Sequence, residues 1–282
     1  MTWPIARRQP SLLQAAILAV FAAIGILSAA IWSAQPRNDR TWQEEYVRPP
    51  RVTLSGDAFH IAPIGDWRYA PQGAVQKTNG TFDAKLADAV RIWYVVGLTR
   101  DGALAGHTFL LFEFRGHRLI GASVEARLEA RERYYAPLGA LNAYEIFYAW
   151  GSAHDVLTRR AVFLHRRLWI YPLALDAPHV RAALEGMLRD TEGAARHPRF
   201  YNTFTANCTS ELYRRIGAPW HYSAVLTGLS ADYLLKRGLI AGGGFAPIKA
   251  QADMAAFIRD NSERTDRDFD AALLRELGRR FP

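Results

Sequence analysis

Cysteine is almost absent from this chain: Cys208 is the only one among 282 residues. One thiol cannot form an internal disulfide, so the fold cannot depend on a disulfide framework. A lone thiol fits a reducing or an oxidising compartment, but in an exported protein an exposed thiol is easily oxidised, so its presence usually has a reason. Two interpretations are open: Cys208 is a small buried hydrophobic residue, which is the commoner role of cysteine, or it is a nucleophile.

The chain also lacks the spacings that are typical of metal, phosphate and nucleic-acid sites. It has no paired cysteines and no His-x-x-x-His pattern, so we expect no metal site and no other cofactor. The glycine-rich stretch AGGGF, residues 241–245, has no lysine and indicates a turn, not a phosphate-binding loop. Nucleic-acid motifs are missing and the basic residues are dispersed, so we expect no nucleic-acid partner.

Composition indicates a globular protein with an excess of positive charge. Half of the residues are hydrophobic and 12% are aromatic, which is enough for one sizeable core beyond the N-terminal segment. Lysine and arginine number 35 against 27 acidic residues, so the formal net charge is +8. Such a balance favours anionic surfaces, either nucleic acid or phospholipid head groups, and charge alone does not choose between them.

The one long hydrophobic run lies near the N-terminus, from Leu12 to Ile31, and carries no charge. At about 1.5 Å per residue in a helix, it is long enough to span a hydrocarbon core of roughly 30 Å. The run exceeds the usual h-region of a signal peptide, about 7–15 residues, which favours an uncleaved anchor over a cleaved signal. We therefore expect residues 1–34 to form a cytoplasmic N-terminus and a transmembrane anchor, with the rest of the chain outside.

The remainder of the chain predicts an α+β fold in which an antiparallel sheet packs against helices. Residues 35–80 are rich in Pro, Gly, Arg and Trp and are interpreted as a connecting and covering segment; residues 81–282 are interpreted as the main domain. Strands are expected at 90–98, 107–114, 117–126, 143–150 and 168–173, where aliphatic, aromatic and β-branched residues concentrate. Helices are expected at 176–195, with Asp176 as N-cap, and at 209–216, 230–237, 251–259 and 269–280.

A hairpin in the middle of the chain brings together two ionisable side chains. It turns most simply at residues 115–117, which places Phe114 opposite Arg118. The same register places His107 directly across from Glu125, with Cβ atoms about 4.5–5.5 Å apart. A bulge or a shorter loop would move one partner to the other face, and Glu113 is a rival carboxylate on the His107 face.

A catalytic thiol needs a base that accepts its proton, and the base works best when a third group fixes its orientation. His107 and Glu125 can supply these two roles. Cys208 precedes the helix expected from residue 209, where the helix dipole and a nearby imidazolium both lower a thiol pKa. Asn207 is expected as a cap of that helix or turn.

Three blocks of sequence carry a family resemblance: GHTFLLFEF, residues 106–114; the stretch from ASVEAR to VLTRR, residues 122–160; and RFYNTFTANCTSELYRR, residues 199–215. In this order they resemble the Lnb-type N-terminal periplasmic domain family, a circularly permuted papain-like group, over most of residues 37–240. The resemblance implies a permuted papain-like (NlpC-type) fold with Cys208 as nucleophile, His107 as base and Glu125 as third member. Asn207 and Tyr201 are candidate donors to the oxyanion.

Members of that family with an assigned activity are lipoprotein N-acyltransferases. The resemblance therefore implies a single-pass protein of the inner membrane, with its catalytic domain on the periplasmic side, that moves an acyl chain from phospholipid to a lipoprotein amine. One fold can host other chemistry, so a cysteine peptidase or amidase acting on cell-envelope peptides stays as an alternative. The third hypothesis for the function is a non-catalytic module of the cell envelope or one that binds nucleic acid.

Overall fold

The computed structural model describes residues 11–14, 16–22 and 35–282. The chain divides into two compact units, Met1–Pro36 and Arg37–Pro282. In the first unit, residues 12–14 and 16–22 are helical. Across the described ranges, no helix has both the length and the apolar character needed to cross a membrane. The expected anchor, residues 12–31, lies partly outside the described residues.

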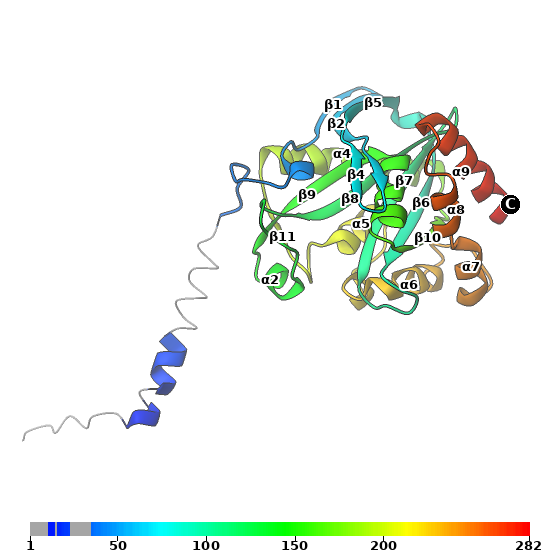
Figure 1. The fold of residues 1–282 in the computed structure, drawn as a ribbon. Coiled ribbons are helices and arrows are strands. Elements are labelled where there is room, and N and C mark those ends of the chain that lie inside the picture. Colours follow the sequence, from blue (N-terminus) through cyan, green and yellow to red (C-terminus); the bar gives the residue numbers. More distant parts are fainter. Residues whose placement is uncertain (1–10, 15, 23–34) are drawn as a thin grey trace, which may run out of the picture. The chain divides into compact units, whose positions relative to one another are not determined.

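Nine strands of the second unit form one sheet in the order β1-β2-β9-β8-β7-β6-β10, with β5 beside β2 and β11 beside β9 (Figure 1). The strands are β1 (Arg51–Ser55), β2 (Ala58–Gly65), β5 (Asn79–Lys85), β6 (Ala89–Leu98), β7 (Gly106–Phe114), β8 (Arg118–Arg127), β9 (Tyr144–Ser152), β10 (Arg167–Pro172) and β11 (Phe200–Tyr201). A separate hairpin contains β3 (Arg68–Ala70) and β4 (Gly73–Gln76).

The expectation of an antiparallel sheet needs one correction. β2 runs parallel to β9 where Gly65 faces Gly151, and the other neighbouring pairs are antiparallel. The parallel pair arises because β2 belongs to the segment 35–80 and reaches β9 without a direct hairpin connection. The fold is therefore α+β with a mixed sheet, and β1, β2 and part of β5 from that segment belong to the sheet.

Helices cover both faces of this sheet. They are α2 (Ala136–Ala140), α3 (Ala153–Thr158), the π-helix η3 (Arg159–Phe163), α4 (Ala177–Arg196), α5 (Cys208–Ile216), α6 (Ser230–Lys236), α7 (Phe245–Ala252), α8 (Ala255–Asp260) and α9 (Asp266–Arg280). Short 3-10 helices are η1 (Glu44–Tyr46), η2 (Leu86–Asp88), η4 (Tyr222–Ala224) and η5 (Thr227–Leu229).

Alternate residues of β6 show how the two layers of helices pack. Tyr94 lies in a core cluster with residues of α4 and α5, such as Leu184 and Leu212. Its neighbour Trp93 points to the opposite face and lies in a second cluster with α3, α8 and α9, including Leu273. Because both faces of β6 are buried over residues 92–98, this part of its sequence is hydrophobic and does not alternate with polar residues.

The prediction of a single helix over residues 251–259 is wrong. The structure has two helices there, α7 and α8, separated at Asp253 and Met254. Asp253 is extended and forms a bridge with Trp169, while the Met254 N–H donates to the Leu168 carbonyl over 2.9 Å. The break therefore comes from pairing with β10, a contact that helical periodicity does not reveal. The helix over 176–195 is confirmed as α4, with Asp176 accepting from the His179 N–H.

The β7–β8 hairpin has the expected register. Phe114 pairs with Arg118 and Phe109 pairs with Ser123, so the loop contains residues 115–117. Gly116 and His117 have φ values of 76° and 58°, the left-handed conformations that close such a loop. The ladder ends at the Phe109–Ser123 pair, and His107 and Glu125 lie two residues beyond it on the same register.

Candidate active site

Three elements bring His107, Glu125 and Cys208 together. His107 is the second residue of β7, Glu125 lies near the end of β8, and Cys208 is the first residue of α5. The α5 helix packs against both strands. The hydroxyl oxygens of Thr108 and Thr209, 2.9 Å apart, join the start of β7 to the start of α5. The N-terminus of the helix is thereby fixed beside the histidine strand.

Asn207 determines where α5 begins. Its side-chain oxygen accepts from the N–H groups of Thr209 and Ser210, and the Ser210 hydroxyl oxygen accepts from the Asn207 N–H, which completes a capping box. The Asn207 amide also donates to the Thr203 carbonyl over 2.6 Å. The expected capping role is confirmed. Since the cap takes the N–H groups of the next residues, the Cys208 N–H is left as the first donor of the helix.

The imidazole of His107 is held through one ring nitrogen. Its Nε2 lies 2.8 Å from the Ser123 hydroxyl oxygen and 3.1 Å from Glu125 Oε1. Ser123 gives its own proton to Glu125 over 2.6 Å, so its oxygen accepts from His107. This places a proton on Nε2 and leaves Nδ1 as the nitrogen that can exchange a proton with a thiol.

An arginine also contacts this oxygen of the Glu125 carboxylate. Arg160, in the π-helix η3, is buried and donates through Nη2 to Glu125 Oε1 over 3.0 Å. Its Nη1 donates to the Val156 carbonyl, and its guanidinium lies 4.4 Å from the centre of the Phe109 ring. A π-helical turn is uncommon and often marks a functional position. Polar groups of Ser123, His107 and Arg160 therefore all lie within 3.1 Å of Glu125 Oε1.

Electrostatics favour a charged thiol and a charged imidazole. Burial alone would raise the pKa of the Cys208 thiol, but the positive charge of His107 and a hydrogen bond to that ring lower it, with the Thr108 N–H and the Thr209 hydroxyl as further donors. Burial would lower the pKa of His107, but the carboxylate of Glu125 outweighs it and raises that pKa to about 9. Burial opposes the charge on Glu125 as well, yet His107 and Arg160 hold its pKa well below the usual range.

Tyrosines lie close to the thiol. Cys208 is 5% exposed and Tyr201, in β11, is 6% exposed. Burial and then the charge of Cys208 raise the pKa of Tyr201 far above its ordinary value, so its hydroxyl keeps its proton next to a thiolate. The ring of Tyr134 meets the ring of Tyr201 edge-on at 5.8 Å. Tyr201 is therefore buried and neutral within the electrostatic influence of Cys208, and its role as an oxyanion donor stays a prediction.

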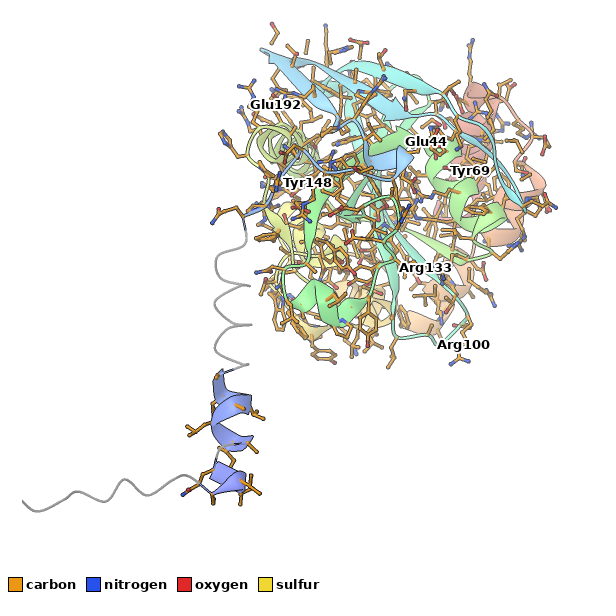
Figure 2. All side chains as sticks on the ribbon, turned by 60° about the vertical axis from the view of Figure 1, so that its left-hand side comes forward. Glu44, Tyr69, Arg100, Arg133, Tyr148 and Glu192 are labelled. Atoms are coloured by element: carbon orange, nitrogen blue, oxygen red, sulfur yellow. The ribbon has the colours of Figure 1, made fainter. Side chains whose placement is uncertain are left out.

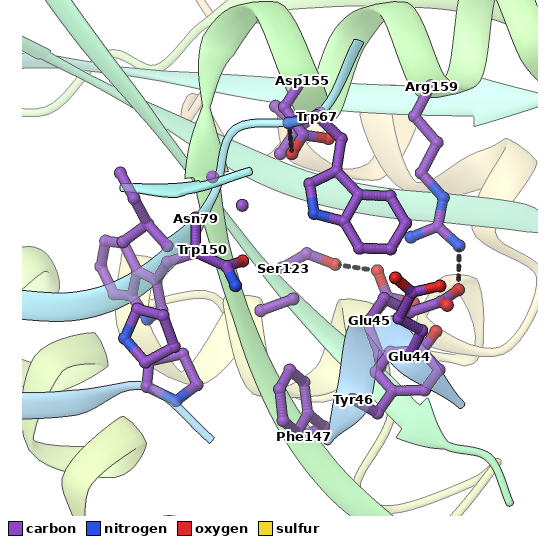
Figure 3. A pocket seen from close by; sticks show the side chains of 18 of the residues that line it. Glu44, Glu45, Tyr46, Trp67, Asn79, Ser123, Phe147, Trp150, Asp155 and Arg159 are labelled. Atoms are coloured by element: carbon purple, nitrogen blue, oxygen red, sulfur yellow. Dashed lines mark hydrogen bonds and ion pairs between the residues drawn. The ribbon is translucent and has the colours of Figure 1, made fainter. Parts of the chain in front are cut away.

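A cleft of about 320 Å³ lies on the other side of the carboxylate. Ser123 and Glu125 form part of its wall, whereas His107 and Cys208 do not line it. Figure 3 shows Arg159 paired with Glu45 across this cleft, at 2.7 Å. The cleft thus reaches Glu125 but not the imidazole of His107, and it does not open on the sulfur of Cys208. In the residues that the structure describes, no group of three or more His, Cys, Asp or Glu side chains could hold a metal ion.

Reasoning from the sequence missed Ser123, Arg160 and Tyr134. Ser123 is two residues before Glu125 on the same strand face, so strand parity could have identified it. Arg160 and Tyr134 come from segments whose positions depend on tertiary packing, and no local pattern points to them. Glu113, the rival carboxylate, instead accepts from the Trp93 indole over 2.9 Å.

Comparison with known proteins gives one match. The model of the family described as the Lnb N-terminal periplasmic domain matches residues 76–220, just over half of the chain. The matched range contains β6 to β9 and α5, and therefore His107, Glu125 and Cys208. No curated protein and no solved structure matches the chain. On the strength of this match, the chain belongs to the Lnb N-terminal periplasmic domain family.

Proposed function

We propose that this protein is a membrane-anchored cysteine acyltransferase that moves an acyl chain from phospholipid, through a Cys208 thioester, to the N-terminal amine of a lipoprotein. The observation that supports it most is the convergence of Cys208, His107 and Glu125 at the start of α5. The uncharged run over residues 12–31 supports a single-pass anchor in the inner membrane, with the catalytic domain in the periplasm. The acyl donor and acceptor follow from the family resemblance.

The first half-reaction forms the thioester. Cys208 gives its proton to Nδ1 of His107, and the thiolate attacks an ester carbonyl of the phospholipid. The tetrahedral intermediate collapses, the ester C–O bond breaks, and the lyso-lipid alkoxide leaves with the proton from His107. The products are a Cys208 thioester and a lyso-lipid, with the imidazole neutral again.

The second half-reaction transfers the acyl chain. The amine attacks the thioester carbonyl, His107 accepts a proton from the attacking nitrogen and returns it to the departing sulfur, and an amide forms. In both halves the Cys208 N–H and the Tyr201 hydroxyl can donate to the oxyanion. Asn207 is a weaker candidate because its amide already donates to the Thr203 carbonyl. Two half-reactions with a covalent intermediate predict ping-pong kinetics.

Intact-protein mass spectrometry tests the first half-reaction. Wild-type protein incubated with phospholipid alone is expected to gain the mass of one acyl group, and hydroxylamine at neutral pH should remove it. Cys208→Ala should gain nothing under the same conditions. A wild-type protein that gains no acyl group, while lyso-lipid accumulates at the same rate in both proteins, would contradict the thioester.

A diacylated lipopeptide tests the acceptor. Added to the acylated protein, it should gain one acyl group as the protein loses it. The alternative is a cysteine peptidase or amidase, because the same thiol, imidazole and carboxylate can also attack a peptide carbonyl. Cleavage of peptide bonds that requires Cys208, with no acyl gain by the lipopeptide, would replace the acyltransferase with this alternative.

A further inference from the structure

Large apolar side chains are exposed at one end of the second unit. Six of them, on and beside α2, in the turn before α5 and at the start of η4, are 46–61% exposed: Tyr135, Leu138, Leu141, Phe204, Trp220 and Tyr222. We call these six residues the docking surface. None of them lines the cleft at Glu125. Single exposed apolar residues are ordinary, but six on adjoining segments indicate an interaction surface.

Hydrogen bonds show that the three segments adjoin. The Thr203 hydroxyl donates to the Ala136 carbonyl over 2.8 Å, and the Thr203 N–H donates to the Gly139 carbonyl, which ties the turn to α2. The Trp220 indole donates to the Phe204 carbonyl over 2.9 Å, which ties the third segment to the turn. The docking surface is therefore continuous from α2 to the start of η4.

Contacts through the turn before α5 and two tyrosines join this surface to the candidate active site. Thr203 also accepts from Asn207, the cap of the helix that Cys208 begins. Tyr134 is the residue before Tyr135 of the docking surface. Its hydroxyl oxygen lies 3.1 Å from that of Thr203, and its ring packs edge-on against the ring of Tyr201. The charge of Cys208 contributes to the raised pKa of both tyrosines. The Tyr134–Tyr201 pair and the turn 202–206 therefore join the docking surface to the site.

Positive charge without an ion-pair partner among the described residues lies near the docking surface. The β6–β7 loop contacts η5, the element after η4, where the Gly228 N–H donates to the Leu104 carbonyl over 2.9 Å. Arg131 and Arg133 precede α2, and Arg100 lies in the β6–β7 loop, at the lower end of the view in Figure 2, away from Glu44 and Tyr69 of the cleft. Within the part of the chain that the structure describes, these three arginines form no ion pair. The acids beside them are engaged: Asp101 pairs with Lys249, and the Glu132 carboxylate accepts from the Glu129 N–H.

We propose that the docking surface rests on an anionic phospholipid bilayer, with Trp220, Tyr222 and Tyr135 at the level of the head groups and the three arginines on lipid phosphates. Exposed aromatic rings with aliphatic neighbours suit the boundary between head groups and acyl chains. Free arginines at the rim complement anionic lipid and pair well with phosphate. The inference rests on the proposed function in one respect: docking here brings the acyl donor to the side of the domain where Cys208 lies.

Fluorescence of the full chain in vesicles tests the contact without turnover. The vesicles contain phosphatidylglycerol, with or without brominated acyl chains that quench tryptophan. Trp220→Phe is expected to remove a component of the wild-type emission that brominated lipid quenches. Trp67→Phe, at the cleft, is the matched control and should remove a component that brominated lipid does not quench. A Trp220 component quenched by aqueous iodide and not by brominated lipid would overturn the proposal.

A second arm separates docking from chemistry. Leu138→Lys combined with Phe204→Lys is expected to slow acyl gain from vesicle phospholipid at least tenfold, while acylation by a water-soluble thioester stays within twofold. Cys208→Ala should keep the Trp220 signal, so docking can hold even if the proposed acyl transfer fails. Equal rates from vesicles for wild type and the double variant would overturn docking. So would a dimer in detergent that Trp220→Phe dissociates, because a second copy would then cover the surface.

Discussion

The Nε2 atom of His107 lies 3.1 Å from Glu125 Oε1, and both atoms share Ser123 as a neighbour. Glu125 is therefore not a lone partner of the imidazole but the centre of a small network that also includes Arg160. The network fixes the ring, keeps its Nε2 protonated and leaves Nδ1 for the thiol. A carboxylate that orients a base in this way is expected to matter for rate more than for folding.

Glu125→Gln tests this orientation. Glutamine keeps the shape but removes the charge that raises the pKa of His107. We expect kcat for acyl transfer to fall by about 100-fold or more, as for other bases that lose their orienting carboxylate. The measurement is the rate of acyl gain by Cys208, followed by mass spectrometry.

The matched control for that variant is Glu113→Gln. Glu113 lies on the same face of β7 as His107 but contacts the Trp93 indole. Its replacement should change kcat less than about threefold, because it makes no contact with the imidazole. If the two variants lose activity equally, Glu125 is not the third member of the site.

The Cys208 thiol is expected to be ionised at neutral pH. Burial raises the pKa of the Cys208 thiol, but the positive charge of His107 outweighs burial and leaves that pKa below its ordinary value, while the pKa of His107 is raised to about 9. The ultraviolet absorbance of the thiolate, taken as wild type minus Cys208→Ala, should be present at pH 7 and disappear on acidification. In His107→Gln the thiol keeps its burial but loses the imidazolium, so the absorbance at pH 7 should vanish.

The control for the thiolate measurement is His117→Gln, at the exposed tip of the β7–β8 hairpin. It should leave the titration of Cys208 unchanged. A thiolate signal at pH 7 that survives in His107→Gln would show that the helix dipole, and not the imidazole, stabilises the charge.

Arg160 is a positioning residue, and Arg159 beside it provides a matched control. Arg160 contacts Glu125, whereas Arg159 pairs with Glu45 across the cleft. Arg160→Met should lower kcat by about 10-fold while changing KM little, because it loosens a group that acts through the imidazole. The charge of Arg160 also lowers the pKa of His107, so its removal should move the alkaline limb of the pH–rate profile above about 9.

Partial rescue of both kcat and the alkaline limb is expected in Arg160→Lys, which restores the charge without the fixed geometry. Arg159→Met should leave the alkaline limb in place. A purely structural role for Arg160 would lower activity in proportion to folded protein and leave the pH profile unmoved, and that result would refute the assignment.

The sequence was sufficient for those parts of the site that depend on local rules. The turn at residues 115–117 and the period of two along a strand place His107 opposite Glu125, and the structure has that register. The start of α5 follows from Asn207, whose side chain suits an N-cap. In both places a few neighbouring residues decide the conformation, so the pattern is visible without knowledge of the rest of the fold.

Other parts depend on contacts between distant segments. Asp253 leaves the helical conformation because it meets Trp169 on β10, although the residues on both sides favour a helix. Arg160 reaches Glu125 from the π-helix η3, which follows α3 directly and lies 35 residues further along the chain than Glu125. β2 meets β9 in parallel at a single pair of glycines. None of these contacts has a signature in nearby residues.

Asp270 supplies a prediction about stability. It lies in α9, is 8% exposed, and accepts from the Leu119 N–H through Oδ2 over 2.9 Å, while Oδ1 has no partner among the residues that the structure describes. Burial raises its pKa from 3.8 to about 7. A carboxyl with a raised pKa costs no stability below pH 3.8, and its cost grows as the pH rises to about 7 and is constant above that.

Asp270→Asn should therefore stabilise the protein relative to wild type as the pH rises. Between pH 4 and pH 8, the difference in the free energy of unfolding, variant minus wild type, is expected to increase by about 2 to 4 kcal/mol. Urea unfolding of both proteins at each pH measures it, because the titration of all other groups cancels in the difference. Asp260→Asn, at the exposed end of α8, is the control and should change the free energy of unfolding by less than about 0.5 kcal/mol at either pH. A difference for Asp270→Asn that stays constant from pH 4 to pH 8 would mean that water reaches this carboxylate and that α9 does not seal it against β8.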